Sequence, residues 1–364
     1  MLKLRRAVVR EVKDASASAA EQQLVIELAG ERLPLRAAVA DVRLVGRAEV
    51  GDELVVNVQA LDIALGSGGF DIVHVNLTRG LRGGEAEGAH VMKLNYTSLQ
   101  HAVEPVEDER LRLPVRRPVA VLAVHGQLAA VAWAFSRGAP GRRLGYVQTE
   151  GGALPGGHSR TAAELRTRGL LDCHLTAGAA FGGDGEAITI PGALHHGLRG
   201  LGWDAAVCGP GPGIVGSSSA LGHGGMYALD CAHAALALGC PTVVVARMSS
   251  GDERARHRGL SHHTRTVLEL LLAAATVALP AGMDLESPDL ERAAAAWPAG
   301  LARHDWRARP VDLDGFASSG LAAETMGRGI GEDPLFFGAG LAGGAVLAEA
   351  ATRTRGEEDA IARR

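Results

Sequence analysis

Between residues 118 and 282 the chain alternates short apolar runs with segments of helical periodicity, and this rhythm restricts the fold more than any other feature of the sequence. Strands buried on both faces read as continuous apolar runs, so the alternation is typical of a parallel sheet covered by helices. We predict an α/β fold with an open, mostly parallel, doubly wound sheet of about six strands. The expected strands are 119–124, 144–148, 173–176, 205–208, 242–246 and 276–279, and the expected helices are 127–137, 161–168, 188–198, 226–238 and 262–274.

The regions that flank this core have other patterns. Residues 1–102 contain several strand-length segments separated by glycine turns, which predicts a small antiparallel β-barrel or sandwich domain. A charged, proline-bounded linker is expected at 103–117. A C-terminal helical extension is expected at 283–351, with helices at 288–297 and 334–350, a short strand near 310–313, and packing onto the α/β core. Residues 352–364 are predicted to form a disordered charged tail.

The charge balance excludes several classes of protein. The chain has 37 Lys+Arg and 41 Asp+Glu, a net charge of −4, with ordinary apolar content, so it is neither disordered nor a general nucleic-acid binder. Its 4 cysteines show no CxxC spacing and suit reduced core thiols. No signal-peptide pattern and no uninterrupted membrane-length apolar run is visible, so we expect a cytoplasmic protein without membrane contact.

Glycine and histidine are concentrated where the predicted strands pass into helices. The chain has 49 glycines and 14 histidines, of which 24 glycines fall in 126–225 and 10 histidines in 118–263. In open α/β sheets ligands bind beyond the carboxyl ends of the strands. The segments 125–126, 149–160, 177–186, 209–225 and 247–261 should therefore converge on one edge of the sheet and form a site there.

Among these strand exits, the segment 209–219 has the most specific sequence pattern. Gly211, Gly213 and Gly216 form a G-x-G-x-x-G pattern, but the position about twenty residues further on is not acidic, as a dinucleotide fingerprint requires. A P-loop is excluded because no lysine follows. Two interpretations stay open: a nest of backbone amides that, with the hydroxyls of Ser217, Ser218 and Ser219, holds an anion, or a solvated glycine turn.

The segment 247–265 carries five of the middle region's arginines and three histidines. Ser261 is placed to cap a helix that begins at His262, and the helix dipole then disfavours the charged form of His262 and His263. Neutral imidazoles suit a general base, a hydrogen-bond donor or a metal ligand. Arg247, Arg254 and Arg258 would bind phosphate or carboxylate. The alternative is a solvated charged loop.

The segment 149–160 offers a second set of candidates. Glu150 and His158 are candidate acid–base groups and Arg160 a candidate anion clamp, although a plain surface loop capped by Ser159 explains the same residues. Asp184 and Glu186 could ligate a cation or charge a helix N-terminus.

A histidine-based metal site is an alternative to anion binding. Three ligands could come from a set of six histidines, together with Asp184 or Glu186: His125, His158, His223, His257, His262 and His263. The sequence has no HExxH or comparable local spacing, so this interpretation depends on convergence of the loops alone. A serine hydrolase is less favoured, because no G-x-S-x-G elbow follows a strand.

Three segments resemble a known bacterial family. The sequences at 93–100 (KLNYTSLQ), 209–219 and 258–264 (RGLSHHT) are similar to those of the family catalogued as domain of unknown function 3866. The N-terminal β region is similar as well, and the resemblance covers nearly the whole chain except the tail. The family's loop has threonines where this chain has Ser217 and Ser219, which keeps the hydroxyls. The resemblance implies no activity and transfers no site residues.

These observations lead to three functional hypotheses. The first is an enzyme, or an enzyme-derived protein, that binds a small anionic metabolite (phosphate or carboxylate) at the carboxyl edge of the sheet. The second is a non-catalytic ligand sensor or interaction protein, with nucleic acid an unfavoured partner. The third is a metal-dependent hydrolase. The sequence names no cofactor, and the apolar helix at 335–350 could pack within one chain or between the subunits of a homo-oligomer.

Overall fold

The computed structural model describes residues 1–13, 20–30, 35–65, 68–84, 88–107, 110–282 and 303–362. It divides into two compact units. The first contains Met1–Glu104 together with Gly157–Ala163, and the second contains Pro105–Gly156 and Glu164–Arg364. The second unit therefore begins within the predicted linker.

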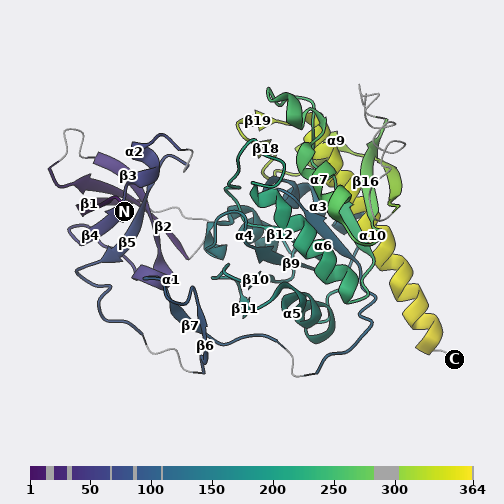
Figure 1. Cartoon of the computed structure of the whole chain (residues 1–364), viewed down its shortest axis with the longest axis horizontal. Coiled ribbons are helices and arrows are strands. Elements are labelled where there is room, and N and C mark those ends of the chain that lie inside the picture. Colours follow the sequence, from purple (N-terminus) through teal and green to yellow (C-terminus); the bar gives the residue numbers. More distant parts are fainter. Residues whose placement is uncertain are drawn as a thin grey trace. The chain divides into compact units, whose positions relative to one another are not determined.

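The first unit is built around a closed five-stranded barrel with the strand order β1-β2-β3-β5-β4 (Figure 1). Of the two architectures predicted, a barrel or a sandwich, the barrel is confirmed. One pair, β3 with β5, is parallel, and the other pairs are antiparallel. The barrel elements are β1 (Leu4–Lys13), β2 (Glu21–Leu28), β3 (Leu35–Asp41), α1 (Val42–Val45), β4 (Glu53–Asn57), α2 (Gln59–Asp62) and β5 (Asp71–Asn76), and a hairpin of β6 (Val91–Lys93) and β7 (His101–Val103) follows.

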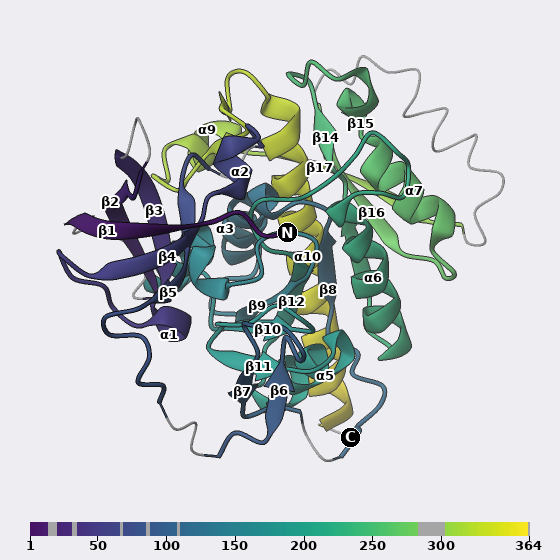
Figure 2. The same cartoon turned by 60° about the vertical axis from the view of Figure 1, so that its left-hand side comes forward.

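The second unit contains an eight-stranded, entirely parallel sheet in the order β11-β10-β9-β12-β8-β13-β16-β17 (Figures 1 and 2). All six predicted strands are present. The strands are β8 (Val119–Leu122), β9 (Leu144–Thr149), β10 (His174–Ala177), β11 (Gly185–Ala187), β12 (Ala205–Pro210), β13 (Thr242–Val245), β16 (Thr276–Ala281) and β17 (Asp305–Pro310). The central strands β8, β9, β12 and β13 are buried at every position, which is why most of their residues are apolar.

The sheet is larger than predicted, because a strand is added at each edge. β11 has only three residues, and β17 has the sequence DWRARP with no buried position, so neither forms a long apolar run. The strand expected near 310–313 begins and ends earlier, at Asp305 and Pro310.

Helices cover both faces of this sheet. On one face α3 packs against α10, and α10 also contacts β13 and β16; on the other α6 contacts β12 and both neighbouring helices. The helices of the strand–helix series are α3 (Leu128–Gly138), α4 (Arg160–Thr167), α5 (Ile190–His195), which a π-helical turn (His196–Gly200) continues, α6 (Tyr227–Ala237) and α7 (His262–Leu270). Each lies where the sequence predicts a helix.

The C-terminal region contains α9 (Leu313–Ala317), a hairpin of β18 (Glu324–Thr325) and β19 (Arg328–Gly329), and the long helix α10 (Pro334–Ala362). The helix continues through 352–362, where the sequence predicts a disordered tail, so that prediction is wrong for these residues. The helix expected at 288–297 lies outside the described residues. Pro334–Thr354 is long and apolar enough to cross a membrane. However, 78% of an apolar 18-residue stretch within it is buried inside the structure, as is common for a core helix.

Trp203 shows how glycine serves the packing of the second unit. This fully buried ring lies between Gly145 on β9 and Gly197 in the π-helical turn. A Cβ atom at Gly145 would lie 2.1 Å from the ring, and one at Gly197 would lie 2.2 Å from it. The indole nitrogen also donates a hydrogen bond to Asp172 at 3.0 Å. Neither glycine can therefore be replaced without displacing the ring.

We predict that Gly145→Ala and Gly197→Ala each lower the free energy of unfolding by about 2 kcal/mol or more, because the added methyl overpacks the core. Gly331→Ala is the control, since a Cβ there meets nothing within 4 Å. Urea unfolding measures all three. Equal midpoints for Gly145→Ala and Gly331→Ala would contradict the packing described.

Candidate functional site

The loops that follow β12 and β13 meet at the carboxyl edge of the sheet, on either side of β8. Gly225, in a 3-10 turn at Gly224–Met226, lies at their junction. A Cβ atom at Gly225 would lie 2.9 Å from Nδ1 of His263, 3.1 Å from Nδ1 of His223 and 3.2 Å from the carbonyl oxygen of Ala123. The absence of a side chain at Gly225 thus lets two histidines from different loops meet beyond the end of β8.

Helix α7 begins as the sequence predicts. The side chain of Ser261 accepts a hydrogen bond from the backbone N–H of His263 at 3.3 Å, so Ser261 is the N-cap and His262 and His263 occupy the first turn. Upstream, β14 (Met248–Ser249) pairs with β15 (Gly259–Leu260), and a 3-10 turn at Ala255–His257 lies between them. His257 then approaches Ser261, with 2.8 Å between Nδ1 and Oγ.

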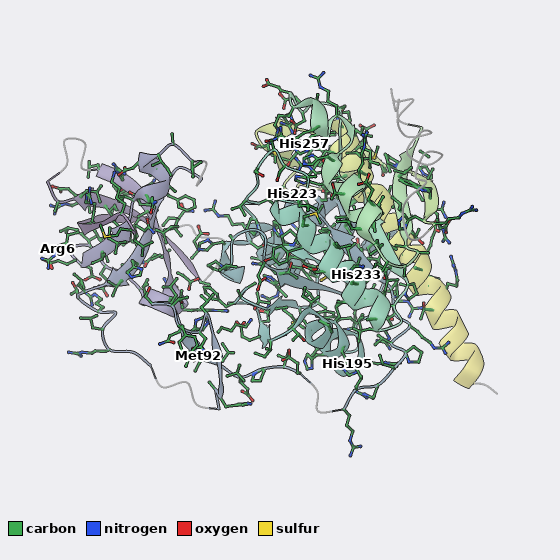
Figure 3. All side chains as sticks on the ribbon, viewed as in Figure 1. Arg6, Met92, His195, His223, His233 and His257 are labelled. Atoms are coloured by element: carbon green, nitrogen blue, oxygen red, sulfur yellow. The ribbon has the colours of Figure 1, made fainter. Side chains whose placement is uncertain are left out.

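Four histidines form one cluster, which we call the histidine cluster: His223, His257, His262 and His263. The rings of His223 and His263 stack with centroids 3.7 Å apart and planes 12° from parallel, and His262 contacts the rings of the other three. Three of the four are buried and His262 is half-buried. Figure 3 shows His223 and His257 close together, away from His195 and His233.

Arg247 fixes the hydrogen-bonding state of the cluster. Its side chain is buried, with 4% of the residue exposed, and its Nη1 donates to Nδ1 of His263 at 2.7 Å. A guanidinium can only donate, so neutral His263 must carry its hydrogen on Nε2. Burial lowers the pKa of Arg247 to about 10, and burial, with Arg247 as the next cause, lowers the pKa of His263 to about 2.

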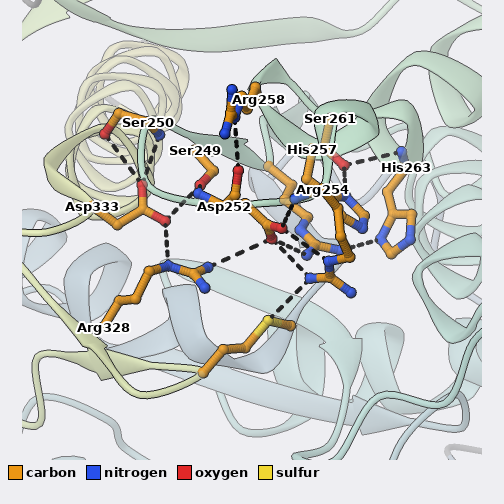
Figure 4. A network of polar contacts seen from close by, with 12 residues as sticks. Ser249, Ser250, Asp252, Arg254, His257, Arg258, Ser261, His263, Arg328 and Asp333 are labelled. Atoms are coloured by element: carbon orange, nitrogen blue, oxygen red, sulfur yellow. Dashed lines mark hydrogen bonds and ion pairs between the residues drawn. The ribbon is translucent and has the colours of Figure 1, made fainter.

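Asp252 balances part of this charge (Figure 4). Its carboxylate accepts two hydrogen bonds from Arg254, at 2.9 and 2.8 Å, and lies 3.8 Å from Arg247 and 3.5 Å from Arg328. The hydrogen bonds from Arg254 hold the pKa of Asp252 well below its usual range. Arg258 donates through Nε to the carbonyl oxygen of Asp252 at 2.9 Å.

A second carboxylate, Asp333, completes the network. It accepts from the hydroxyl of Ser249 at 2.6 Å and from Arg328 at 3.3 Å, and it is fully buried. The network thus contains four guanidinium groups and two carboxylates: Arg247, Arg254 and Arg328 pair with the carboxylates of Asp252 and Asp333, and Arg258 donates to the backbone carbonyl of Asp252. It has a surplus of two positive charges beside the histidine cluster.

Two serine hydroxyls of the predicted anion nest bond within their own loop in the described structure. Ser217 and Ser219 hydrogen-bond each other at 2.9 Å and also bond to Gly222, so their hydroxyls brace the loop itself. Ser218 and the rest of 215–222 are exposed. At Gly211 a Cβ atom would lie 2.5 Å from the carbonyl oxygen of Ala153, so this glycine lets the β9 and β12 loops approach. Gly213 has a φ of 71°, and Gly216 forms a bridge with His223.

Other predicted site residues lie outside the cluster's contacts. Glu150 accepts from the amide of Ala179 at 2.6 Å, which ties the β9 loop to the β10 loop. His158 and Arg160 belong to the first unit, where Arg160 pairs with Glu21 at 2.6 Å and burial lowers the pKa of His158.

The remaining metal candidates also have structural partners. Asp184 pairs with Arg166 at 2.7 Å, and Glu186 accepts from Thr176 at 2.8 Å. His125 lies 3.2 Å from the hydroxyl of Tyr146, and its burial lowers its pKa to about 4.

Three of the clustered histidines meet the distance requirement for a metal centre. One ring nitrogen from each of His223, His262 and His263 lies within 4.8 Å of the others. However, an ion must lie in the plane of each imidazole that binds it, because the nitrogen lone pair is in that plane. The stacked planes of His223 and His263 cannot share such an ion unless a ring rotates. The hydrogen bond from Arg247 opposes binding at His263 as well.

Sequence reasoning did not single out several members of this site. His223 appears there only as one of six metal candidates, although its position just before the Gly224–Gly225 pair and α6 is a local signal. Asp252 lies inside the recognised segment 247–265 and could have been chosen as the counter-charge for its arginines. Arg328 and Asp333 are about eighty residues away in sequence, and no pattern connects them to the loop.

Protonation of the cluster provides a test. Burial lowers the pKa of His257 to about 3 and of His263 to about 2, whereas the unfolded chain binds these protons near pH 6.5. The unfolded state therefore binds more protons below pH 6.5, and stability falls as pH falls from 6.5 toward 3. We expect a slope of up to about 1.4 kcal/mol per pH unit for each such histidine.

His263→Gln should reduce the slope of unfolding free energy against pH by the contribution of one histidine, up to about 1.4 kcal/mol per pH unit. His233→Gln, outside the cluster, should leave the slope unchanged. Urea unfolding from pH 7.5 to 4.5 measures both. An unaltered slope in His263→Gln would show that His263 is not held neutral.

Comparison with known proteins gives a family. No curated protein and no solved structure matches the chain. One family model, described as protein of unknown function (DUF3866), matches residues 37–344, which include β4, β5 and most of β3 of the barrel, the whole sheet and the histidine cluster. The chain therefore belongs to the DUF3866 family.

Proposed function

We propose that this protein is an enzyme that binds a small anionic metabolite at the carboxyl edge of its α/β sheet, where the histidine cluster meets the arginine network. The observation that carries the proposal is the buried Arg247, which donates to His263 among histidines of lowered pKa. The surplus of positive charge favours an anion, and neutral imidazoles beside it can transfer protons.

The residues would divide this work by their chemistry. Arg247, Arg254 and Arg258 would neutralise the ligand's charge, since phosphate and carboxylate match the forked donors of guanidinium. His263 can donate only through Nε2, because Nδ1 accepts from Arg247. His262 is half-buried, and neither of its ring nitrogens makes a hydrogen bond of normal geometry, so it is a further candidate to exchange a proton with a ligand.

Access would come through the glycine- and serine-containing loop. Residues 215–222 are exposed and end at the buried His223. Their hydrogen bonds are largely internal, as between Ser217 and Gly222 at 2.9 Å, so the loop can move as a unit. In this proposal its backbone amides close over a bound anion. The described cysteines are free thiols, three of them buried, which supports a reducing, cytoplasmic location.

A metal-dependent hydrolase is the second candidate, and it rests on the ring nitrogens of His223, His262 and His263 within 4.8 Å of one another. The stacked rings of His223 and His263 and the hydrogen bond from Arg247 favour the anion site over this alternative. The two proposals differ in what the purified protein should contain and bind.

For the anion site, phosphate or carboxylates should raise the thermal midpoint of the protein, because they bind the folded state. Arg247→Gln and Arg258→Gln should each weaken binding about tenfold, since each removes one charge of the surplus. Isothermal titration measures this, with Arg353→Gln, on the exposed face of α10, as the control that should bind like wild type. The proposal fails if phosphates and carboxylates leave the midpoint unchanged.

For the metal alternative, elemental analysis of protein purified without chelator should find well under about 0.2 equivalents of zinc, manganese or iron per chain if the stacked geometry holds. A stoichiometric metal that His223→Gln removes and His233→Gln retains would reverse the ranking of the two proposals.

A further inference from the structure

His223 has a ring nitrogen with nothing to bind. The residue is 7% exposed, and its Nε2 lies 2.9 Å from the carbonyl oxygen of Ala220. A carbonyl only accepts, so Nε2 carries the hydrogen and neutral His223 has a bare lone pair on Nδ1. This Nδ1 is buried and has no hydrogen-bond partner. Buried polar atoms are nearly always satisfied, and an exception calls for an absent partner.

The surroundings of His223 determine what that partner can be. The β13 loop and α7 place Arg247, His262 and His263 around the ring, and Arg247 and His262 both disfavour its charged form. On the β8 side the carbonyl oxygen of Ala123 and Nδ1 of His223 both lie beside Gly225, 3.2 and 3.1 Å from the position of a Cβ atom there. In the β9 loop the titratable group is Glu150, which accepts from the amide of Ala179. A cation is therefore repelled here, whereas an anion is attracted.

The net charge of the arginine network indicates how much negative charge the ligand carries. Three guanidinium groups pair with two carboxylates, and the fourth, that of Arg258, donates to a backbone carbonyl, so the formal charge of the network is +2. One carboxylate ligand would leave a positive charge uncompensated, and a dianion would not.

We propose that the ligand presents a dianionic phosphoryl group and that it binds together with one proton, which His223 takes up at Nδ1. This deepens the proposed function and rests on it. The proton comes from solvent and occupies the free lone pair, and the resulting N–H donates to a phosphoryl oxygen. No covalent bond of the ligand changes. The charge of the anion offsets the burial of the imidazole, and its repulsion by His262 and Arg247, which keep the ring neutral beforehand.

The other histidines are less suited to this role. Protonating His263 would break its bond with Arg247 at 2.7 Å, and Nδ1 of His257 already contacts Ser261 at 2.8 Å. His262 has two unpartnered nitrogens and is the one real competitor. The experiment therefore needs a variant of each residue, so that proton uptake can be assigned to His223 or to His262.

Isothermal titration of the full chain with sulfate at pH 7.0, repeated in buffers of different ionisation enthalpy, counts the protons. Sulfate is a dianion throughout the neutral range, so it releases no proton of its own. Wild type should take up close to one proton per sulfate. His223→Gln keeps an N–H that can reach the carbonyl of Ala220; it should bind sulfate more weakly and take up none. His262→Gln and His233→Gln should retain the uptake. Phosphate and sulfate should bind at least about tenfold more tightly than acetate.

The outcomes separate the inference from the proposed function. Sulfate binding without proton uptake, uptake that survives in His223→Gln or disappears in His262→Gln, or acetate binding as tightly as sulfate overturns the inference and leaves an anion site in place. If phosphate, sulfate and acetate all fail to bind, the proposed function falls and the inference falls with it.

Discussion

The burial of one positive charge, that of Arg247, is the constraint on which the candidate site depends. A guanidinium removed from water needs acceptors and counter-charge, and here these are Nδ1 of His263 and the carboxylate of Asp252. Asp252 is in turn shared with Arg254 and Arg328, which connects the β13 loop to the segment just before α10. Burial keeps His257 and His263 neutral in the first place, and the charge of Arg247 is the next cause.

Most of the α/β unit could be predicted because its signal is local. Central parallel strands are buried on both faces, so β8 and β13 are apolar at nearly every position, and Ser261 marks the start of α7 by a cap that needs only its own neighbours. The edge strand β17 was predicted too late in the chain, because none of its residues is buried and its arginines interrupt the apolar pattern. For α10, the charged composition after residue 352 indicates a tail, yet the helix already formed by apolar residues extends through it.

The site was predicted in outline and not in detail, for a physical reason. That strand exits converge at one edge follows from topology, and it brings His262 and His263 to Arg247. The contacts between particular strand-exit loops depend on close backbone approaches such as that at Gly225. The hydrophobic pattern of the sequence carries no information about such approaches. His158 and Arg160 follow β9 in sequence yet belong with the barrel unit, and the hydroxyls of Ser217 and Ser219 satisfy their own loop. Hydrogen-bonding capacity is visible in a sequence, whereas the partner that uses it is not.

The position of α10 in the chain has a consequence for synthesis. This helix covers the face of the sheet formed by β13 and β16 and packs along α3, yet every one of those elements precedes it in sequence. During translation the apolar face of the sheet therefore emerges from the ribosome before the helix that covers it. The strands that pair first stay uncovered on this face until Pro334–Thr354 has been synthesised. The second unit therefore completes its core only after nearly all of its residues are made.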